Sequence, residues 1–155
     1  KEHGQKAKEL FENGYNCAQS ILAAFSDETG LGFEESLRLA SSFGGGMGRL
    51  REVCGAVSGM FMVVGAMYGY SDPRDKMAKD EHYRLVQELA KKFEMAEGTI
   101  LCRELLGLPY RRDNPETDPR SLQYYHTRPC NAYVEQAAII LDGCIASRKE
   151  TDSHE

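Results

Sequence analysis

Apolar residues recur along most of the chain at intervals of three and four positions, a spacing that places them on one face of an α-helix. The strict alternation of apolar and polar residues that marks a half-buried strand is not found. The pattern predicts an all-α fold, a single-domain bundle of about six helices around a buried, glycine-rich central helix. We expect one helical domain over residues 1–155, with a core at about 5–147 and a frayed tail at 148–155.

Capping residues and glycines indicate where the helices begin and end. Asn16, with Gln19 three positions later, has the form of a capping box and predicts a helix start. Asp72-Pro73 predicts the start of a long amphipathic helix that ends at Gly98, and Thr99 is expected to cap the short helix that follows. The predicted helices cover about 5–13, 17–30, 34–42, 54–70, 72–98, 99–107 and 131–147.

The central segment at 53–70 carries no charge and contains four glycines. A membrane span needs roughly 20 apolar residues, so this run is slightly short, and no Lys or Arg anchors its C-terminal end. A buried central helix is therefore favoured over a membrane span. Gly55 and Gly59 are four positions apart, so they share one helix face and allow another backbone to approach closely.

The composition is that of a globular chain, with 41% hydrophobic and 28% charged residues. The formal net charge of −5 argues against a general nucleic-acid binder, because such a protein needs a basic surface to release phosphate counterions. Residues 108–129 are rich in Pro, Asp and Arg and are expected to form a long loop with one turn around 120–124.

The chain has five cysteines, an odd number that argues against a fully paired secreted disulfide framework. The first residues are polar and show no signal peptide, although a chain that begins without Met leaves removal of a leader open. We therefore expect a cytoplasmic, reducing location, where unpaired cysteines serve metal binding or redox chemistry.

Four of the five cysteines fall at the expected starts of helices: Cys17, Cys54, Cys102 and Cys130. Helix N-termini carry partial positive charge and unpaired N–H groups, which stabilise a thiolate. The pKa of such a thiol is expected to fall from about 8.5 to roughly 3.5–7.5. Arg49, Arg51 and Arg103 lie near these cysteines in sequence and are expected to add to the effect.

The spacing of the cysteines alone does not identify their chemistry. No C-x-x-C pair is present, so the pattern also fits cysteines that pack as small hydrophobic residues. Cys144 lies in the middle of the last predicted helix, beside Leu141 and Ile145, and is expected to be structural. His126, four residues before Cys130, is a candidate metal ligand by its position, and we interpret it as a loop histidine.

The glycine run Gly44–Gly48 resembles a phosphate-binding loop only superficially. It follows a helix rather than a strand and lacks the Lys-Ser/Thr of that motif. We expect a tight turn that allows close approach to Cys54.

Several segments of the sequence resemble one known family, the C_GCAxxG_C_C family, over about residues 5–147. They are N-C-A-Q at 16–19, F-G-G-G-M-G at 43–48, C-G-A-V-S-G at 54–59, C-R-E-L-L-G at 102–107, and Cys130. The family label writes the central element as GCAxxG, whereas this chain has C-G-A-V-S-G. The four family cysteines correspond to Cys17, Cys54, Cys102 and Cys130, and Cys144 has no counterpart.

The resemblance implies a redox function, since members of the family are described as redox-active because of their cysteines. The family is also similar to the non-haem part of split-Soret cytochromes, which implies an iron–sulfur site, although this chain has no C-x-x-C-H motif for haem.

The residues and the resemblance together predict that Cys17, Cys54, Cys102 and Cys130 are redox thiols that form one site. The site would hold an iron–sulfur cluster or another thiophilic metal, or would cycle between dithiol and disulfide. The alternative is a structural zinc site in a helical module without redox activity. Residues expected to line the cofactor site are Gly45, Gly46, Gly48 and Gly55.

The sequence leaves open whether the protein is an oxidoreductase or an electron-transfer protein. A redox partner is expected but not identified. The glycine-rich central helix also fits a homodimer interface, because glycines allow close packing there.

Overall fold

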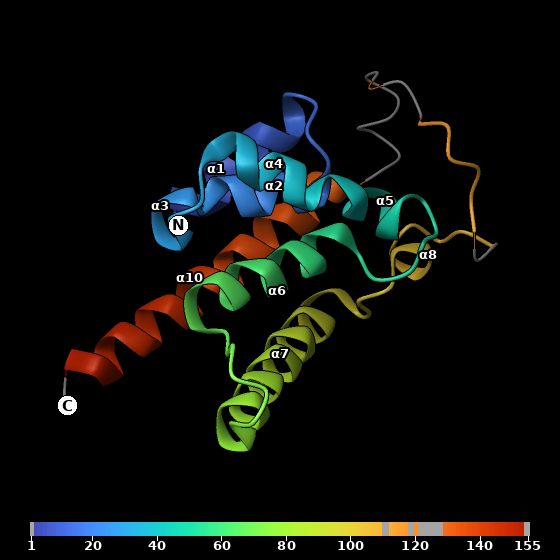
Figure 1. Cartoon of the computed structure of the whole chain (residues 1–155). Helices are drawn as coiled ribbons and strands as arrows, with labels where there is room; N and C mark the ends of the chain where they lie inside the picture. Colours follow the sequence, from blue (N-terminus) through green and yellow to red (C-terminus); the bar gives the residue numbers. More distant parts are fainter. Residues whose placement is uncertain (1, 110–111, 118–119, 121–128, 154–155) are drawn as a thin grey trace.

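The computed structural model describes residues 2–109, 112–117, 120 and 129–153, and it is all-α, as predicted (Figure 1). No strand forms in these residues, although one isolated antiparallel bridge joins Val53 to Leu101. The helices are α1 (Glu2–Glu12), α2 (Cys17–Ala24), α3 (Ser26–Thr29), α4 (Phe33–Ala40), α5 (Gly44–Met47), α6 (Gly55–Tyr68), α7 (Lys76–Glu97), α8 (Cys102–Leu105) and α10 (Cys130–Ser153), with a 3-10 turn, η1, at Ser41–Phe43.

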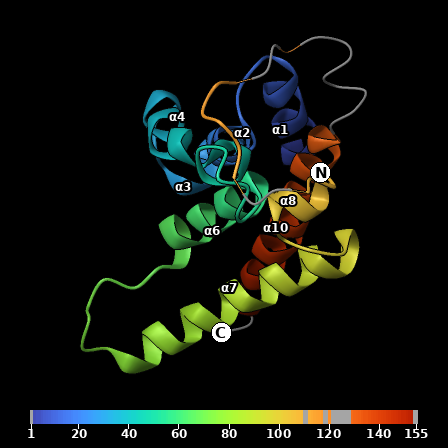
Figure 2. The ribbon, with the colours of Figure 1, turned by 90° about the vertical axis from the view of Figure 1, so that its right-hand side faces the viewer.

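The helices pack around α2, α6 and α10. Helix α1 lies along α10, and α2 lies along α6 and also contacts α4 (Figure 1). Helix α7 contacts both α6 and α10, while the connection from α6 to α7 swings away from the rest of the fold (Figure 2). The largest side chains of the core come from α1, α2, α6, α7 and α10 and from the junction between α2 and α3. They include Phe11, Phe25, Met60, Phe93 and Leu141, of which Phe25 lies at that junction.

Glycines allow α2 and α6 to approach each other closely, as predicted for Gly55 and Gly59. A Cβ atom at Gly55 would lie 3.1 Å from Cys17 Cβ and 2.9 Å from the Phe43 carbonyl oxygen. A Cβ atom at Gly59 would lie 2.8 Å from Ile21 Cβ. Any larger residue at these two positions would push the helices apart.

The predicted capping box and one predicted helix stop are confirmed. Asn16 Oδ1 accepts the Gln19 N–H at 2.8 Å, and Gln19 Oε1 accepts the Asn16 N–H at 3.0 Å. Gly98 ends α7 with a left-handed φ of 96°. The second predicted helix, however, is divided at Phe25 into α2 and α3.

Two predicted helix starts are wrong. Helix α7 begins after Asp75, whose carboxylate accepts the Ala78 N–H at 3.0 Å, rather than at Asp72-Pro73. The Asp72 carboxylate instead accepts the Arg74 N–H at 3.0 Å and holds a turn before the helix. Both Asp72 and Asp75 are suitable N-cap residues, and Asp75 is the one that caps α7.

Thr99 does not cap α8. Its hydroxyl oxygen accepts the Leu101 N–H at 3.1 Å, and Leu101 is the residue at the N-cap position. The last helix also differs from the prediction, because α10 continues to Ser153 instead of ending near 147. The segment predicted to be frayed is therefore helical to that residue.

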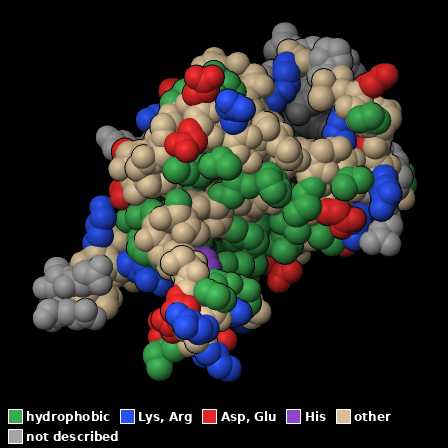
Figure 3. Space-filling model, viewed as in Figure 1, with side chains coloured by type: hydrophobic (Ala, Val, Ile, Leu, Met, Phe, Trp, Pro, Cys, Tyr) green, Lys and Arg blue, Asp and Glu red, His purple; other side chains and the backbone are tan. Residues whose placement is uncertain are grey.

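The first part of helix α6 is buried, as predicted for the central helix, and its C-terminal end is more exposed. Its first turns are buried, but Gly65 and Ala66 are exposed and Phe61 and Tyr68 are half-buried. The reason is that the connection to α7 leaves this end uncovered, and hydrophobic side chains gather across the middle of this face (Figure 3). The homodimer stays a prediction. Within the described ranges, no helix combines the length and apolar character that crossing a membrane would require.

Candidate functional site

The four predicted site cysteines each stand at the start of a helix. Cys17, Cys102 and Cys130 are the first residues of α2, α8 and α10, and Cys54 is the residue directly before α6. All four line one cavity of about 50 Å³. By the same measure a water molecule needs roughly 10–15 Å³, so the cavity has room for a group larger than a single water. The structure thus brings together residues that lie up to 113 positions apart, from 17 to 130.

The isolated β-bridge places Cys54 beside Cys102. The Cys54 N–H donates to the Ile100 carbonyl at 2.7 Å, and the Cys102 N–H donates to the Glu52 carbonyl at 2.6 Å. Side chains alternate between the two faces of an antiparallel pair, so both cysteines point to the face opposite the bridged residues. Such diagonal neighbours lie about 7–8 Å apart between Cα atoms.

Helix α2 brings Cys17 to the same cavity, and α10 brings Cys130. The start of α2 lies close to the start of α6 at Gly55, because glycine has no side chain that would separate the two helices. The thiols of Cys17 and Cys130 are hydrogen-bonded to each other. The first residues of α2, α6, α8 and α10 therefore converge on one point.

The glycine run forms a left-handed turn, labelled α5. The φ angle lies between 60° and 72° at every residue from 45 to 49, and the Gly48 N–H donates to the Gly44 carbonyl at 2.9 Å. L-residues other than glycine adopt this conformation at a cost, which explains the glycines. A Cβ atom at Gly46 would lie 2.6 Å from Cys102 Cβ. The turn therefore makes room for Cys102, whereas the sequence had suggested Cys54.

Three of the four glycines expected at the cofactor site line the cavity: Gly45, Gly46 and Gly55. Gly48 does not. It lines a neighbouring groove of about 350 Å³, which also contacts Arg49 and Arg51.

The pKa values of Cys54 and Cys17 are raised, contrary to the prediction of lowered values. Cys54 is 5% exposed, and burial raises its pKa to about 12, with negative charge on Cys130 and Cys102 adding to the shift. The amides of Ala56 and Val57, in the first turn of α6, act in the opposite direction and favour the thiolate. The helix N-terminus thus acts as expected, but burial and repulsion between the sulfurs outweigh it.

The pKa of Cys17 is also raised. Its hydrogen bond to Cys130 raises its pKa most, followed by burial and by negative charge on the other three site cysteines. Four thiolates therefore cannot share this cavity without a compensating positive charge.

Arg51 supplies one positive charge at the edge of the cavity. It is 2% exposed, and its Nη1 donates to Cys102 Sγ at 3.5 Å. Its Nη2 pairs with Asp113 Oδ2 at 2.9 Å, and Arg49 pairs with the same oxygen at 2.8 Å. Of the three predicted arginines, Arg51 donates a hydrogen bond to Cys102, whereas Arg103 forms an ion pair with Glu52.

Sequence reasoning missed three residues of the site. Asp113 lies in a segment read only as a loop, and nothing in its local sequence indicates a contact with Arg51. Arg120 lines the cavity and donates to two backbone carbonyls near the end of α1. Tyr133 also lines it and donates to the Leu105 carbonyl at 3.1 Å. Its position three residues after Cys130, on the same helix face, was a signal that could have found it.

The remaining candidates lie elsewhere. Cys144 is buried in the core, in agreement with the structural role expected for it, and the cavity lining does not include it. His126 lies outside the described residues, as does most of the predicted turn at 120–124.

The spacing of the sulfurs tests which metal group the cysteines fit. Among the described residues, no three cysteine sulfurs lie within 4.8 Å of one another. A single tetrahedral metal ion with bonds of about 2.3 Å would hold its thiolates about 3.8 Å apart. In an iron–sulfur cluster the thiolates bind different irons and are spread more widely. A single zinc ion would therefore require the sulfurs to move closer together, and the all-sulfur donor set suits a thiophilic metal or an iron–sulfur cluster.

Comparison with known proteins gives one family. The family described as "Putative redox-active protein (C_GCAxxG_C_C)" matches residues 15–144, a range that contains all four site cysteines. No curated protein and no solved structure resembles the chain closely enough to count as a match.

Proposed function

We propose that this chain, which belongs to the C_GCAxxG_C_C family, is an electron-transfer protein whose cysteines hold an iron–sulfur cluster. The observation that carries the proposal is the convergence of four helix-starting cysteines on one buried cavity: Cys17, Cys54, Cys102 and Cys130. The family description supports redox activity, and the cluster and the electron-transfer role are our inference from the site.

The charge balance of the cavity favours a metal group. As free thiols, Cys17 and Cys54 have raised pKa values, caused at Cys17 first by its hydrogen bond to Cys130 and at Cys54 first by burial, with repulsion from the other sulfurs adding to both. Metal ions supply the missing positive charge, and their binding releases the thiol protons. A cluster with thiolate ligands retains net negative charge, which suits the helix N-termini and Arg51 around it.

When bound, an iron–sulfur cluster supplies one-electron transfer at a potential set by its surroundings. The residues of this chain control those surroundings in two ways. Cys17, Cys54 and Cys102 are each less than 9% exposed, so the site is shielded from water. Arg51 donates to Cys102 Sγ, and a hydrogen bond to a ligand sulfur is one of the factors that set the potential.

A dithiol–disulfide mechanism is less well supported. Cys17 and Cys130 are hydrogen-bonded and form the natural pair for a disulfide. A dithiol enzyme, however, needs an attacking thiolate, and a raised pKa leaves little thiolate at neutral pH. A structural zinc site is disfavoured by the spacing of the sulfurs.

The experiment that tests the proposal is purification without oxygen, followed by the visible spectrum and assays for iron, zinc and sulfide. Thiols are counted by alkylation before and after reduction. A brown protein with iron and sulfide supports the cluster, and a Cys144→Ala control should keep the colour while Cys54→Ala loses it. Zinc without sulfide would support the structural module, and a gain of two thiols on reduction would support the dithiol. Five thiols that are unprotected in every state would overturn the shared site.

The redox partner and the location belong to the same proposal. Thiols stay reduced in the cytoplasm, so a cytoplasmic location suits the unassembled site. We expect the partner to be another electron carrier, which donates to or accepts from the cluster.

A further inference from the structure

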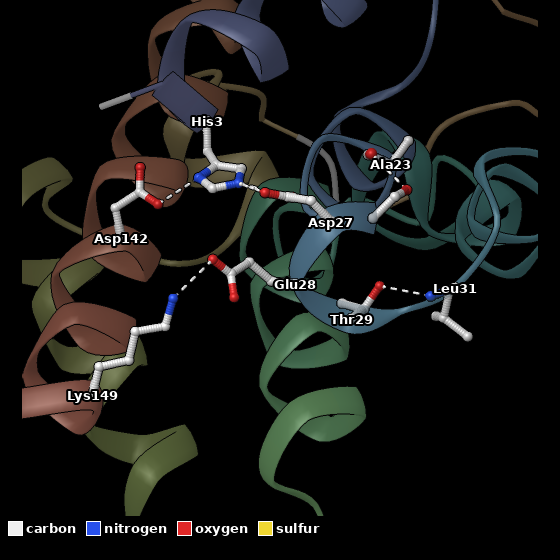
Figure 4. A network of polar contacts seen from close by, with 9 residues as sticks. His3, Ala23, Asp27, Glu28, Thr29, Leu31, Asp142 and Lys149 are labelled. Atoms are coloured by element: carbon white, nitrogen blue, oxygen red, sulfur yellow. Dashed lines mark hydrogen bonds and ion pairs between the residues drawn. The ribbon is translucent and has the colours of Figure 1, made fainter. Parts of the chain in front are cut away.

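A second cluster of metal-ligating groups lies away from the cysteines, around His3. The His3 ring stands between two carboxylates, with Nδ1 2.7 Å from Asp142 Oδ1 and Nε2 2.9 Å from Asp27 Oδ1 (Figure 4). The ring stacks on Phe25 with centroids 4.1 Å apart and planes 10° from parallel. The His3 side chain is only 12% exposed, so its orientation is fixed by packing.

The hydrogen-bonding groups around His3 require a cation. Ionised carboxylates only accept hydrogen bonds, and a neutral imidazole has a single N–H to donate. If Nδ1 donates to Asp142, the lone pair of Nε2 faces an Asp27 oxygen at 2.9 Å, and two acceptors at that distance repel each other. Either a proton or a metal ion must therefore lie between His3 and Asp27.

A third ligand stands beside this pair. One ligand atom each from His3, Asp27 and Glu28 lies within 4.8 Å of the other two. Asp142 holds the opposite ring nitrogen, which is the arrangement found behind metal-bound histidines, where a carboxylate fixes the tautomer and the ring. The ligands come from α1 and α3, and the supporting carboxylate comes from α10.

A lysine already provides positive charge at this position. Lys149 Nζ lies 3.4 Å from Glu28 Oε2, and the lysine side chain is 67% exposed (Figure 4). Glu28 therefore pairs with a cation at this position. Because an exposed ion pair is weak, a metal ion could displace the lysine from Glu28.

We propose that His3, Asp27 and Glu28 bind a divalent first-row metal ion, in the range from Mn²⁺ to Zn²⁺, with Asp142 as a positioning residue. One imidazole and two carboxylates are nitrogen and oxygen donors that suit these ions, and water completes the coordination. The site is separate from the cysteine cavity, because Asp142 lies about 18 Å further along α10 than Cys130 at about 1.5 Å per residue. The bound ion joins α1 to α3, and the hydrogen bond between His3 and Asp142 links this site to α10.

The test is a titration of the full chain, labelled with ¹⁵N, with Mn²⁺ under reducing conditions. Mn²⁺ prefers oxygen and nitrogen ligands over thiolates, so it separates this site from the cysteines. Paramagnetic broadening should be strongest at the amides near residues 3, 27 and 28, and should be much weaker near Cys54 and Cys102. No broadening at these three residues up to millimolar Mn²⁺ would overturn the proposal.

Variants distinguish a metal site from a histidine that is simply protonated. His3→Gln should abolish the local broadening, and Asp142→Asn should weaken Mn²⁺ binding about 10- to 100-fold. Lys149→Met should strengthen binding several-fold because it removes the competing cation, while the control Lys91→Met on α7 should leave it unchanged. Unchanged broadening in His3→Gln would show that Mn²⁺ binds without the histidine, and unchanged affinity in Lys149→Met would show that Glu28 is not a ligand. Either result would overturn the proposed site. If His3→Gln does not fold, Glu28→Gln serves the same purpose.

Discussion

The close approach of Cys102 to the glycine turn can be tested by a pair of substitutions within that turn. Gly46 and Gly48 both have left-handed backbones, with φ values of 69° and 60°. A Cβ atom at Gly46 would lie 2.6 Å from Cys102 Cβ and 2.8 Å from the Glu52 backbone nitrogen. At Gly48 the nearest atom would be the Ser42 carbonyl oxygen, at 3.8 Å. The two positions therefore share the backbone strain, and only one has the steric conflict.

The expected loss of stability follows from these distances. The left-handed conformation costs a residue with a Cβ atom about 1–2 kcal/mol, and this cost applies to both Gly46→Ala and Gly48→Ala. Overpacking costs a further 1–3 kcal/mol, and it applies to Gly46→Ala alone because backbone atoms surround the site. Gly48→Ala should thus lower the unfolding free energy by about 1–2 kcal/mol, and Gly46→Ala by about 2–5 kcal/mol.

The assay is urea unfolding of the reduced, metal-free proteins, followed by circular dichroism. Equal slopes with denaturant would show that the variants unfold from comparably folded states, so that the midpoints report stability. Iron content after anaerobic purification gives a second reading, because displacement of Cys102 should also reduce cluster loading. Equal stabilities of the two variants, or a less stable Gly48→Ala, would refute the packing of Gly46 against Cys102.

Three further predictions concern α6, the cavity wall and the Asp113 contact. Gly65→Ala should stabilise the protein by about 0.5–1 kcal/mol, since a Cβ atom there meets open space. Gly59→Ala should destabilise it by about 1–3 kcal/mol, because a Cβ atom there meets Ile21. Thermal unfolding compares the two variants, and a change of the same sign in both would contradict the packing of Gly59 against α2. Tyr133→Phe should cost about 0.5–1.5 kcal/mol through the lost bond to a carbonyl, measured by urea unfolding, and no loss would mean that water replaces the hydroxyl. Arg51 holds the pKa of Asp113 below its usual range, so Asp113 adds stability above its unfolded pKa of about 3.9 that is lost as the pH falls through the lower folded value. Asp113→Asn should therefore be less stable than the unaltered chain at neutral pH and equally stable in acid; a constant difference across the pH range would argue against the ion pair.

Local sequence determined much of the secondary structure. Apolar periodicity located the main helices, because a helix face is set by residues three and four positions apart. The capping box at Asn16 and the stop at Gly98 depend only on backbone groups within one helical turn, so they could be recognised directly. The start of α7 could not, because Asp72 and Asp75 are both suitable N-cap residues and the local sequence does not distinguish between them.

The protonation of the thiols was predicted in the wrong direction for a related reason. A helix N-terminus is a local feature, and the effect of Ala56 and Val57 on Cys54 is indeed present. Burial and the approach of the other sulfurs are not local, because they depend on which helices meet. At Cys54 these long-range effects are larger than the helix effect.

The sequence by itself determined that the chain is helical, that four cysteines begin helices and that Cys144 falls within one. Only the tertiary structure decided that the four helix starts meet at one cavity, that the glycine turn supports Cys102 and that Arg51 and Asp113 stand beside it. It also decided that His3 lies between Asp27 and Asp142. The physical reason is range: helix formation and capping depend on neighbours within about four residues, whereas these contacts join segments dozens of residues apart whose distances are fixed only when the core packs.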